Sequence, residues 1–273
     1  MTRHAAVLGS PVAHSLSPLI HRAGYDAAGL SDWRYQAIEC IEAELPRLLA
    51  RCDETWMGFS VTMPLKTTAL AVADTAGATA TALAAANTLV RSGDGWHAEN
   101  TDAPGMVDAL TERGVTNVSR LAVLGAGGTA RAALGAAAAL KVDEVVIYAR
   151  RRAAVADLAP VAERLNVALR AADWSKAADA AEADLVVSTV PKGVSDDVSI
   201  AWQPTTVLFD VLYDPWPTPL ATTALAAGCR VLTGLDLLLA QAVRQFEMFT
   251  GIEAPVMRMR EALELRGVSS DTK

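Results

Sequence analysis

Residues 121–130 read Leu-Ala-Val-Leu-Gly-Ala-Gly-Gly-Thr-Ala. The four apolar residues are typical of a buried strand, and the Ala-rich run Thr129–Leu140 after the glycines is typical of a helix. Between a strand and a helix, the spacing Gly125-x-Gly127-x-x-Ala130 is the fingerprint of a dinucleotide-binding turn. The first glycine permits a sharp turn, the second lets the backbone approach a pyrophosphate, and the small third residue lets the helix pack on the strand. The stretch therefore predicts a dinucleotide-binding domain; the alternative is a plain strand-to-helix turn.

The end of the next predicted strand indicates which dinucleotide binds. An NAD-specific domain usually carries an acidic residue there, about 20 positions on, for the ribose 2′-hydroxyl. This chain instead has Arg150, Arg151 and Arg152 directly after the strand Glu144–Ala149. Guanidinium groups form charge-assisted, bidentate hydrogen bonds with a 2′-phosphate, so we predict NADP as the cofactor. The alternative is three solvated arginines at a helix start, where cations oppose the helix dipole.

Strand-like and helix-like runs alternate along the rest of the chain. After the glycine turn, further strands are expected at Asp184–Thr189, Val207–Val211 and Arg230–Leu232. In the first half, strands are expected at Ala5–Gly9, Trp33–Cys40 and Trp56–Val61, and helices at Ser17–Gly29, Glu44–Arg51 and Pro64–Val72. This alternation predicts a largely parallel sheet covered on both faces in each half. The turn residues 92–95 predict a hairpin between Asn87–Arg91 and Trp96–Glu99. Helices are also expected at Asp102–Arg113, Leu235–Thr250 and Ala254–Leu265.

The charge and cysteine content of the chain limit which partners and metal sites it can have. The 273 residues include 24 Lys and Arg against 31 Asp and Glu, a net charge of −7, and no basic run is longer than 150–152. We therefore expect no nucleic acid or membrane partner. No apolar stretch has the length of a transmembrane helix or the form of a secretory signal, so we expect a cytoplasmic protein. Cys40, Cys52 and Cys229 form no C-x-x-C pair, which predicts three reduced thiols and no metal site.

Polar residues follow several predicted strands at the end where a parallel sheet binds its ligand. They are Ser15 and Ser17 after the first strand, Thr62 and Lys66 after the third, and Asn87 and Asp102 around the hairpin. Ligands of an open parallel sheet lie outside the carboxyl ends of the strands, so these loops are expected to converge on one cleft. Each residue alone has a simpler explanation, because Ser17 and Asp102 are good helix N-caps and Lys66 is a typical solvated helix residue.

Several sequence motifs occur in order along nearly the whole chain. They are Gly9-Ser10-Pro11 with Ser15-Leu16-Ser17-Pro18, Val61-Thr62-Met63-Pro64-Leu65-Lys66, Ala86-Asn87-Thr88, Asn100-Thr101-Asp102, Gly125-Ala126-Gly127-Gly128-Thr129-Ala130, Asp210-Val211-Leu212-Tyr213 and Gly234-Leu235-Asp236-Leu237-Leu238-Leu239-Ala240-Gln241. Together these motifs resemble the shikimate dehydrogenase family, oxidoreductases that reduce 3-dehydroshikimate reversibly with NADPH in aromatic amino acid biosynthesis. The resemblance implies an N-terminal α/β substrate-binding lobe at residues 1–104, a Rossmann-type doubly wound NADP-binding domain at 105–236, C-terminal helices at 237–273 that return to the first lobe, and a cleft between the two parts.

The resemblance also implies a role for each matching residue. Lys66 and Asp102 would form the catalytic acid-base pair. The substrate would be bound by Ser15, Ser17, Thr62, Lys66, Asn87, Asp102, Tyr213 and Gln241. The cofactor would be bound by Gly125, Ala126, Gly127, Gly128, Thr129, Ala130, Arg150, Arg151, Thr189, Val211 and Gly234. Lys66 would donate the proton to the developing alkoxide, held in place by Asp102.

Two departures from the family pattern leave alternatives open. The family often has Asn before the Val-Thr pair, where this chain has Ser60, and its usual Asn-Arg-Thr after the second nucleotide strand reads Ala149-Arg150-Arg151 here. The second change removes one expected hydrogen bond on the adenosine side, so the NADP preference rests on the arginines. The alternatives are an NAD-dependent quinate/shikimate dehydrogenase and a catalytically silent dinucleotide-binding sensor. A monomer and a homodimer are both compatible with the sequence.

Overall fold

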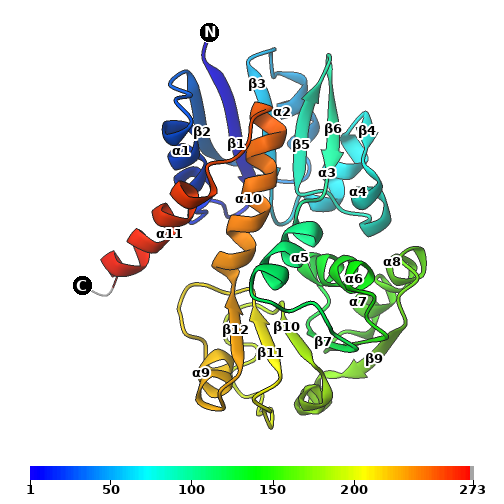
Figure 1. Ribbon diagram of the computed structural model, residues 1–273. Helices are drawn as coiled ribbons and strands as arrows, with labels where there is room; N and C mark the ends of the chain where they lie inside the picture. The colour runs from blue at the N-terminus through cyan, green and yellow to red at the C-terminus, as the bar shows by residue number, and fades with distance from the viewer. Residues whose placement is uncertain (271–273) are drawn as a thin grey trace. The chain divides into compact units, whose positions relative to one another are not determined.

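The computed structural model describes the backbone of residues 1–270 and the side chains of residues 1–265. The chain forms two compact units (Figure 1). The first comprises Met1–Thr101 together with the chain from Leu238 onward, and the second comprises Asp102–Leu237. No helix among the described residues has the length and hydropathy to cross a membrane.

The first unit is built on a mixed six-stranded sheet. Its strands are β1 (Arg3–Gly9), β2 (Trp33–Glu39), β3 (Trp56–Val61), β4 (Thr75–Ala76), β5 (Thr88–Ser92) and β6 (Gly95–Glu99), in the order β2-β1-β3-β5-β6-β4. Strands β2, β1 and β3 are parallel, but β5 runs antiparallel to both β3 and β6. The predicted hairpin is confirmed, with Ser92 opposite Gly95 and Gly93 at a φ of +58°. The expectation of a largely parallel sheet is confirmed, since only β5 runs against the direction of the other strands, and the hairpin brings this strand into the sheet.

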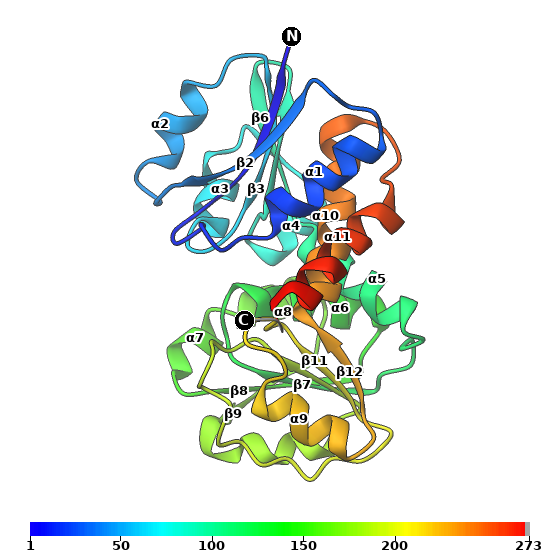
Figure 2. The same cartoon turned by 90° about the vertical axis from the view of Figure 1, so that its left-hand side faces the viewer.

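Helices cover both faces of this sheet. They are α1 (Ser17–Ala27), α2 (Leu45–Ala50), α3 (Lys66–Val72), α4 (Ala78–Leu83), α10 (Gly234–Thr250) and α11 (Val256–Ser270). Leu45 and Leu49 of α2, Ala69 of α3 and Ala80 of α4 share one apolar core with Phe59 of β3. On the other face, α1 packs against α11 (Figure 2), and a Cβ on Gly58 of β3 would overlap the Phe249 ring of α10.

The second unit has a wholly parallel sheet in the Rossmann order. Its strands are β7 (Arg120–Leu124), β8 (Glu144–Ala149), β9 (Leu169–Asp173), β10 (Leu185–Ser188), β11 (Val207–Asp210) and β12 (Arg230–Thr233), in the order β12-β11-β10-β7-β8-β9. Its helices are α5 (Asp102–Glu112), α6 (Gly128–Leu140), α7 (Arg152–Ala156), α8 (Ala159–Arg164), the 3₁₀ helix η1 (Trp174–Glu182) and α9 (Pro219–Ala226). The alternating chain therefore forms the doubly wound domain predicted from the glycine turn.

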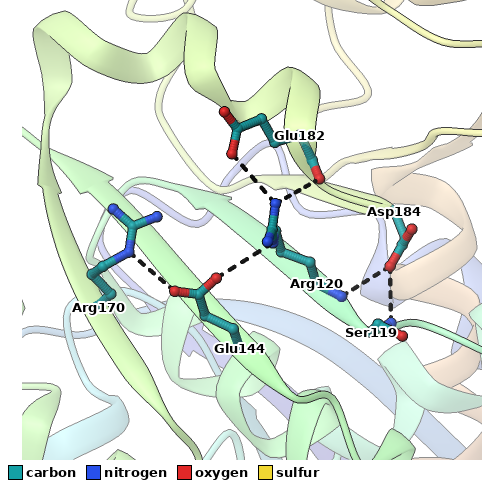
Figure 3. Close-up of polar contacts among 6 residues, drawn as sticks. All are labelled: Ser119, Arg120, Glu144, Arg170, Glu182 and Asp184. Atoms are coloured by element: carbon teal, nitrogen blue, oxygen red, sulfur yellow. Dashed lines mark hydrogen bonds and ion pairs between the residues drawn. The ribbon is translucent and has the colours of Figure 1, made fainter.

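Ion pairs and hydrogen bonds of charged side chains link the amino ends of these strands (Figure 3). Arg120 contacts Glu144 Oε2 through Nε at 3.3 Å and Glu182 Oε2 through Nη1 at 3.3 Å. Arg170 Nε contacts the other oxygen of Glu144 at 3.1 Å. Asp184 accepts hydrogen bonds from the main-chain N–H groups of residues 119 and 120, both at 2.9 Å. These ion pairs are solvent-exposed, so each contributes less than about 1 kcal/mol and they align the strands more than they stabilise the fold.

The three cysteines are free thiols. Cys40 and Cys229 are buried and Cys52 is half-buried. Burial raises the pKa of all three thiols, that of Cys52 to about 11. The thiols therefore stay protonated near neutral pH and are poor nucleophiles.

A buried histidine lies inside the first unit. The His21 ring is fully buried and stacks on Tyr35, with centroids 4.1 Å apart and planes 5° apart. Neither ring nitrogen has a hydrogen-bond partner in the part of the chain that the structure describes. Burial lowers the pKa of His21 to about 3, against a smaller opposing effect of the Gln245 amide. The imidazole is therefore neutral in the folded protein at any pH above that value.

We expect His21→Phe to reduce the acid sensitivity of the protein. The pKa of His21 is about 3 in the folded protein against an ordinary value of 6.5, so between these pH values the unfolded chain carries one more proton than the folded one. The contribution of neutral His21 to the free energy of unfolding is thus fully present above pH 6.5. Below pH 6.5 it decreases as the pH falls, by up to about 1.4 kcal/mol per pH unit. Urea unfolding near pH 7.5 and pH 5 should show about 2 kcal/mol less loss for His21→Phe than for the parent. An unchanged pH slope, equal to that of the exposed control His14→Asn, would contradict this expectation.

Candidate functional site

Four strands of the first unit bring polar residues to one end of the sheet. The end of β1 lies against the loop after β3, because Thr62 N–H donates to Leu8 O at 2.9 Å and Ser10 N–H donates to Met63 O at 3.0 Å. A Cβ on Gly9 would overlap the Thr62 side chain and lie 2.9 Å from Met63 O. Gly9 therefore permits the close approach of these two chain segments, both of which belong to the motifs identified from the sequence.

Main-chain hydrogen bonds bring Lys66 and Asn87 close together. Lys66 is the first residue of α3 and is half-buried, and its carbonyl oxygen accepts a hydrogen bond from Ala86 N–H at 2.9 Å. Asn87 follows directly, and its carbonyl oxygen accepts from Val61 N–H at 2.6 Å. The antiparallel pairing of β3 and β5 thus places the loop that carries Lys66 beside the start of β5.

The Asn87 side chain is held by the strand ends around it. Its Oδ1 accepts from Thr101 N–H at 2.7 Å and from Thr88 Oγ1 at 2.9 Å, and its Nδ2 donates to Thr101 Oγ1 at 2.9 Å. Asp102 is the next residue, buried in the first turn of α5. The structure therefore joins the Asn87 motif and the Asn-Thr-Asp motif through direct hydrogen bonds.

Ser17 does not cap a helix with its side chain. The N-cap of α1 is Leu16, which makes no side-chain cap hydrogen bond, and Ser17 is the first helical residue. Ser17 N–H instead donates to Ser15 Oγ at 3.3 Å, while Ser17 itself is buried. The simpler explanation of Ser17 as an N-cap is therefore wrong, and the two serines are linked to each other.

Gln241 lies on the buried side of α10. Its Nε2 donates to Leu238 O, one turn earlier, at 2.8 Å. One turn later, Gln245 Nε2 donates to Asn87 O at 3.1 Å. Residues four apart share a helix face, so Gln241 is on the face of α10 that contacts β5. Sequence reasoning missed Gln245, although its spacing of four from Gln241 is a signal for a shared face.

In the second unit, the glycine turn has the geometry of a phosphate-binding cradle. Gly125 has a φ of +104°, and a Cβ there would lie 2.7 Å from Thr189 Oγ1. That hydroxyl donates to Leu124 O at 2.9 Å, so Thr189 is fixed beside the turn. A Cβ on Gly127 would have no described atom within 4 Å, and Ala130 is fully buried. The turn thus requires a glycine at its first position and is open at its second, where α6 presents its N-terminus.

A second close approach brings together Gly234, Val211 and Tyr213. A Cβ on Gly234 would overlap Val211 O and lie 3.0 Å from the Tyr213 ring, and Gly234 N–H donates to Leu212 O at 3.1 Å. Asp210 fixes the same loop by accepting from Leu212 N–H at 3.2 Å and from Thr218 Oγ1 at 2.7 Å. Burial raises the pKa of Asp210, while these hydrogen bonds oppose the shift. Gly234 is required because no side chain fits against that loop.

The arginines after β8 are all exposed. Arg150 and Arg151 lie between β8 and α7, and Arg151 is the N-cap of this five-residue helix. Ala149, where the family usually has Asn, is buried at the end of β8. The two guanidinium groups are thus available to solvent or to an anionic ligand at the carboxyl end of β8. No group of three metal-ligating residues occurs within the described part of the chain.

Comparisons with known proteins place these features in one family. Two family models match, the shikimate dehydrogenase substrate binding domain at residues 7–89 and the shikimate 5'-dehydrogenase C-terminal domain at residues 234–264. The shikimate dehydrogenase (NADP(+)) of Desulfitobacterium hafniense is 32% identical over 269 residues, covering 96% of this chain and 98% of that protein.

Solved structures give the same result. The crystal structure of Mycobacterium tuberculosis shikimate dehydrogenase matches with a TM-score of 0.86 and 44% identity, covering 97% of this chain and 99% of that one. The Thermus thermophilus shikimate 5-dehydrogenase, in complex with NADP(H) and shikimate, matches with a TM-score of 0.83 and 32% identity over 97% and 99% of the two chains. The expected fold class is confirmed. The chain therefore belongs to the shikimate dehydrogenase family.

Proposed function

We propose that this protein catalyses the reversible, NADPH-dependent reduction of 3-dehydroshikimate to shikimate, a step of chorismate and aromatic amino acid biosynthesis. The observation that carries the proposal is the junction of Lys66, Asn87 and the Asn-Thr-Asp motif at one end of the first sheet. The names of the similar proteins support it, since they are shikimate dehydrogenases that use NADP(+).

The chain's own residues supply the proton chemistry of this reaction. NADPH supplies the hydride when it is bound. Lys66 would hold a proton on Nζ and donate it to the carbonyl oxygen as that oxygen becomes an alkoxide. Asp102 would hold a substrate hydroxyl and keep the Lys66 ammonium in place. Ser15, Ser17, Thr62, Asn87, Tyr213 and Gln241 would bind the carboxylate and the remaining hydroxyls.

The residues of the second unit fit the cofactor. The open space at Gly127 and the N-terminus of α6 suit a pyrophosphate, and the exposed Arg150 and Arg151 suit a 2′-phosphate. Thr189, Val211 and Gly234 would complete this site with residues 125–130. In this proposal residues 1–104 form the substrate-binding lobe, residues 105–236 form the NADP-binding domain, and residues 237–273 form C-terminal helices that return to the first lobe. The cytoplasmic location expected from the sequence stays a prediction.

Steady-state kinetics would test this function against its alternatives. We expect the purified protein to oxidise shikimate with NADP⁺ at a higher kcat/KM than quinate with NADP⁺ or shikimate with NAD⁺. A preference for quinate and NAD⁺ would instead support the NAD-dependent quinate/shikimate dehydrogenase. Binding of NADPH without turnover of either acid would support a silent sensor, although Lys66 and Asp102 are both in their motifs.

We expect Arg150→Ala to weaken NADPH binding at least tenfold while leaving NADH binding nearly unchanged. A hydrogen bond between charged groups contributes about 1.5 to 3 kcal/mol, or roughly 10- to 100-fold in affinity, and NADH has no 2′-phosphate to lose. Because the arginine is exposed, the effect should shrink as salt rises. Paired titrations of parent and variant with both cofactors measure it. Equal weakening of NADPH and NADH would show that Arg150 supports the fold and does not bind the phosphate.

A further inference from the structure

A chain of buried hydrogen bonds crosses the first unit and ends on Asn87. The Tyr35 hydroxyl donates to Ser60 Oγ at 2.6 Å, and Ser60 Oγ donates to Gln245 Oε1 at 2.5 Å. Gln245 Nε2 then donates to Thr88 Oγ1 at 2.9 Å and to Asn87 O at 3.1 Å. Thr88 Oγ1 donates to Asn87 Oδ1 at 2.9 Å. All five residues are buried.

A main-chain group fixes the direction of these bonds. Asn87 O can only accept, so the NH₂ group of Gln245 points toward Asn87 O and Thr88. Gln245 Oε1 then accepts the hydrogen of Ser60 Oγ, which in turn accepts from the Tyr35 hydroxyl. Thr88 accepts from Gln245 and donates its hydrogen to Asn87 Oδ1. The chain therefore acts together with the Thr101 N–H group to set Asn87 Oδ1 inward.

Asn87 is consequently held as a hydrogen-bond donor. Its Oδ1 accepts from Thr88 Oγ1, from Thr101 N–H and, at 3.2 Å, from Thr101 Oγ1, and its Nδ2 donates to Thr101 Oγ1. An amide in the opposite orientation would place Nδ2 against the N–H group of Thr101, where it has no acceptor. A substrate oxygen at Asn87 would therefore meet an N–H group.

The other end of the chain is the Tyr35 hydroxyl. Burial raises the pKa of Tyr35, so this hydroxyl keeps its hydrogen for Ser60.

We propose that Thr88, Gln245 and Ser60 are positioning residues, which hold Asn87 as a donor toward a hydroxyl or carboxylate oxygen of the substrate. The inference rests on the proposed function, in which Asn87 binds the substrate. Ser60 stands where the family often has Asn, and here its hydroxyl is bonded on both sides. None of the three is assigned to substrate or cofactor, so they act only through Asn87.

Thr88→Val is the sharpest test, because it removes the hydroxyl and keeps the branched shape that a strand favours. We expect KM for shikimate to rise about three- to tenfold, the size of one neutral hydrogen bond, with kcat and the KM for NADP⁺ within about twofold of the parent. Thr88→Ser keeps the hydroxyl and should stay within about twofold of the parent in all three constants. A merely structural role would reduce the active fraction, and so kcat, without changing KM.

Two further variants complete the experiment. Thr250→Val removes a hydroxyl that donates to Phe246 O in the same helix as Gln245, and should leave every constant unchanged. Gln245→Met should raise KM for shikimate as Thr88→Val does, and the double variant should raise it by less than the product of the two effects, because both act through one chain of bonds. Melting temperatures of all variants would show that they fold.

The possible results separate the inference from the proposed function. A parent that oxidises shikimate, with an unchanged KM in Thr88→Val or an equal loss in Thr88→Ser, overturns the positioning role alone. Independent, fully multiplicative effects of Thr88→Val and Gln245→Met also overturn it. A parent that binds NADPH but does not oxidise shikimate overturns the proposed function, and the positioning role with it.

Discussion

Lys66→Ala is expected to lower the turnover of shikimate by about 100-fold or more, with a modest effect on shikimate binding. A general acid-base group typically contributes 10²- to 10⁴-fold to the rate, and Lys66 is assigned the proton of the reacting oxygen. The lysine begins α3 beside the Asn87 strand, so its loss removes a proton donor without removing a core side chain. Steady-state kcat and a direct shikimate titration measure the two effects separately.

Two controls define what this result means. Lys176→Ala removes the same side chain from an exposed position on η1 and should leave kcat unchanged. Lys66→Arg keeps the positive charge but holds its proton too tightly to donate it, so it should be nearly as slow as Lys66→Ala. Equal turnover of Lys66→Ala and the parent would remove Lys66 from the mechanism.

Asp102→Asn is expected to damage both turnover and substrate binding. The carboxylate is assigned to a substrate hydroxyl and to the Lys66 ammonium, and a hydrogen bond to a charged group is worth about 10- to 100-fold. Asp102 is buried in the first turn of α5. A carboxylate there also interacts favourably with the helix dipole and stabilises the fold by about 0.3 to 1 kcal/mol. Kinetics and urea unfolding of the same preparation distinguish the two roles.

The matched control for Asp102 is on the same helix. Asp108→Asn removes an exposed carboxylate of α5 and should leave KM for shikimate unchanged. A loss of stability in Asp102→Asn without any change in kcat or KM would favour the helix-start role and contradict the catalytic assignment.

The second unit was the more predictable part of the fold. Its glycine spacing and continuous apolar runs specify parallel strands buried on both faces, and six parallel strands are present. Strand β9 was not predicted, because Leu169–Asp173 has neither an apolar run nor a clean alternation. It lies at the edge of the sheet and is recruited by pairing with β8, which is a tertiary effect.

The first unit shows the limit of local patterns. The hairpin was predicted from its turn residues, but nothing local indicates that β5 pairs antiparallel to β3 and makes the sheet mixed. The hydrogen bond between Ser60 and Gln245 joins residues 185 positions apart, so no local stretch of the sequence can predict it. Ser17 matched the N-cap pattern, yet the helix begins one residue earlier because Ser15 Oγ receives the Ser17 N–H.

The most direct test is the reduction reaction itself, with both products counted. When the purified protein is mixed with 3-dehydroshikimate and NADPH, we expect one shikimate to form for each NADPH oxidised, measured by chromatography and by the loss of NADPH absorbance. Lys66→Ala should bind NADPH as the parent does and form shikimate at least about 100-fold more slowly. Tight NADPH binding by the parent without any shikimate formed would contradict the account.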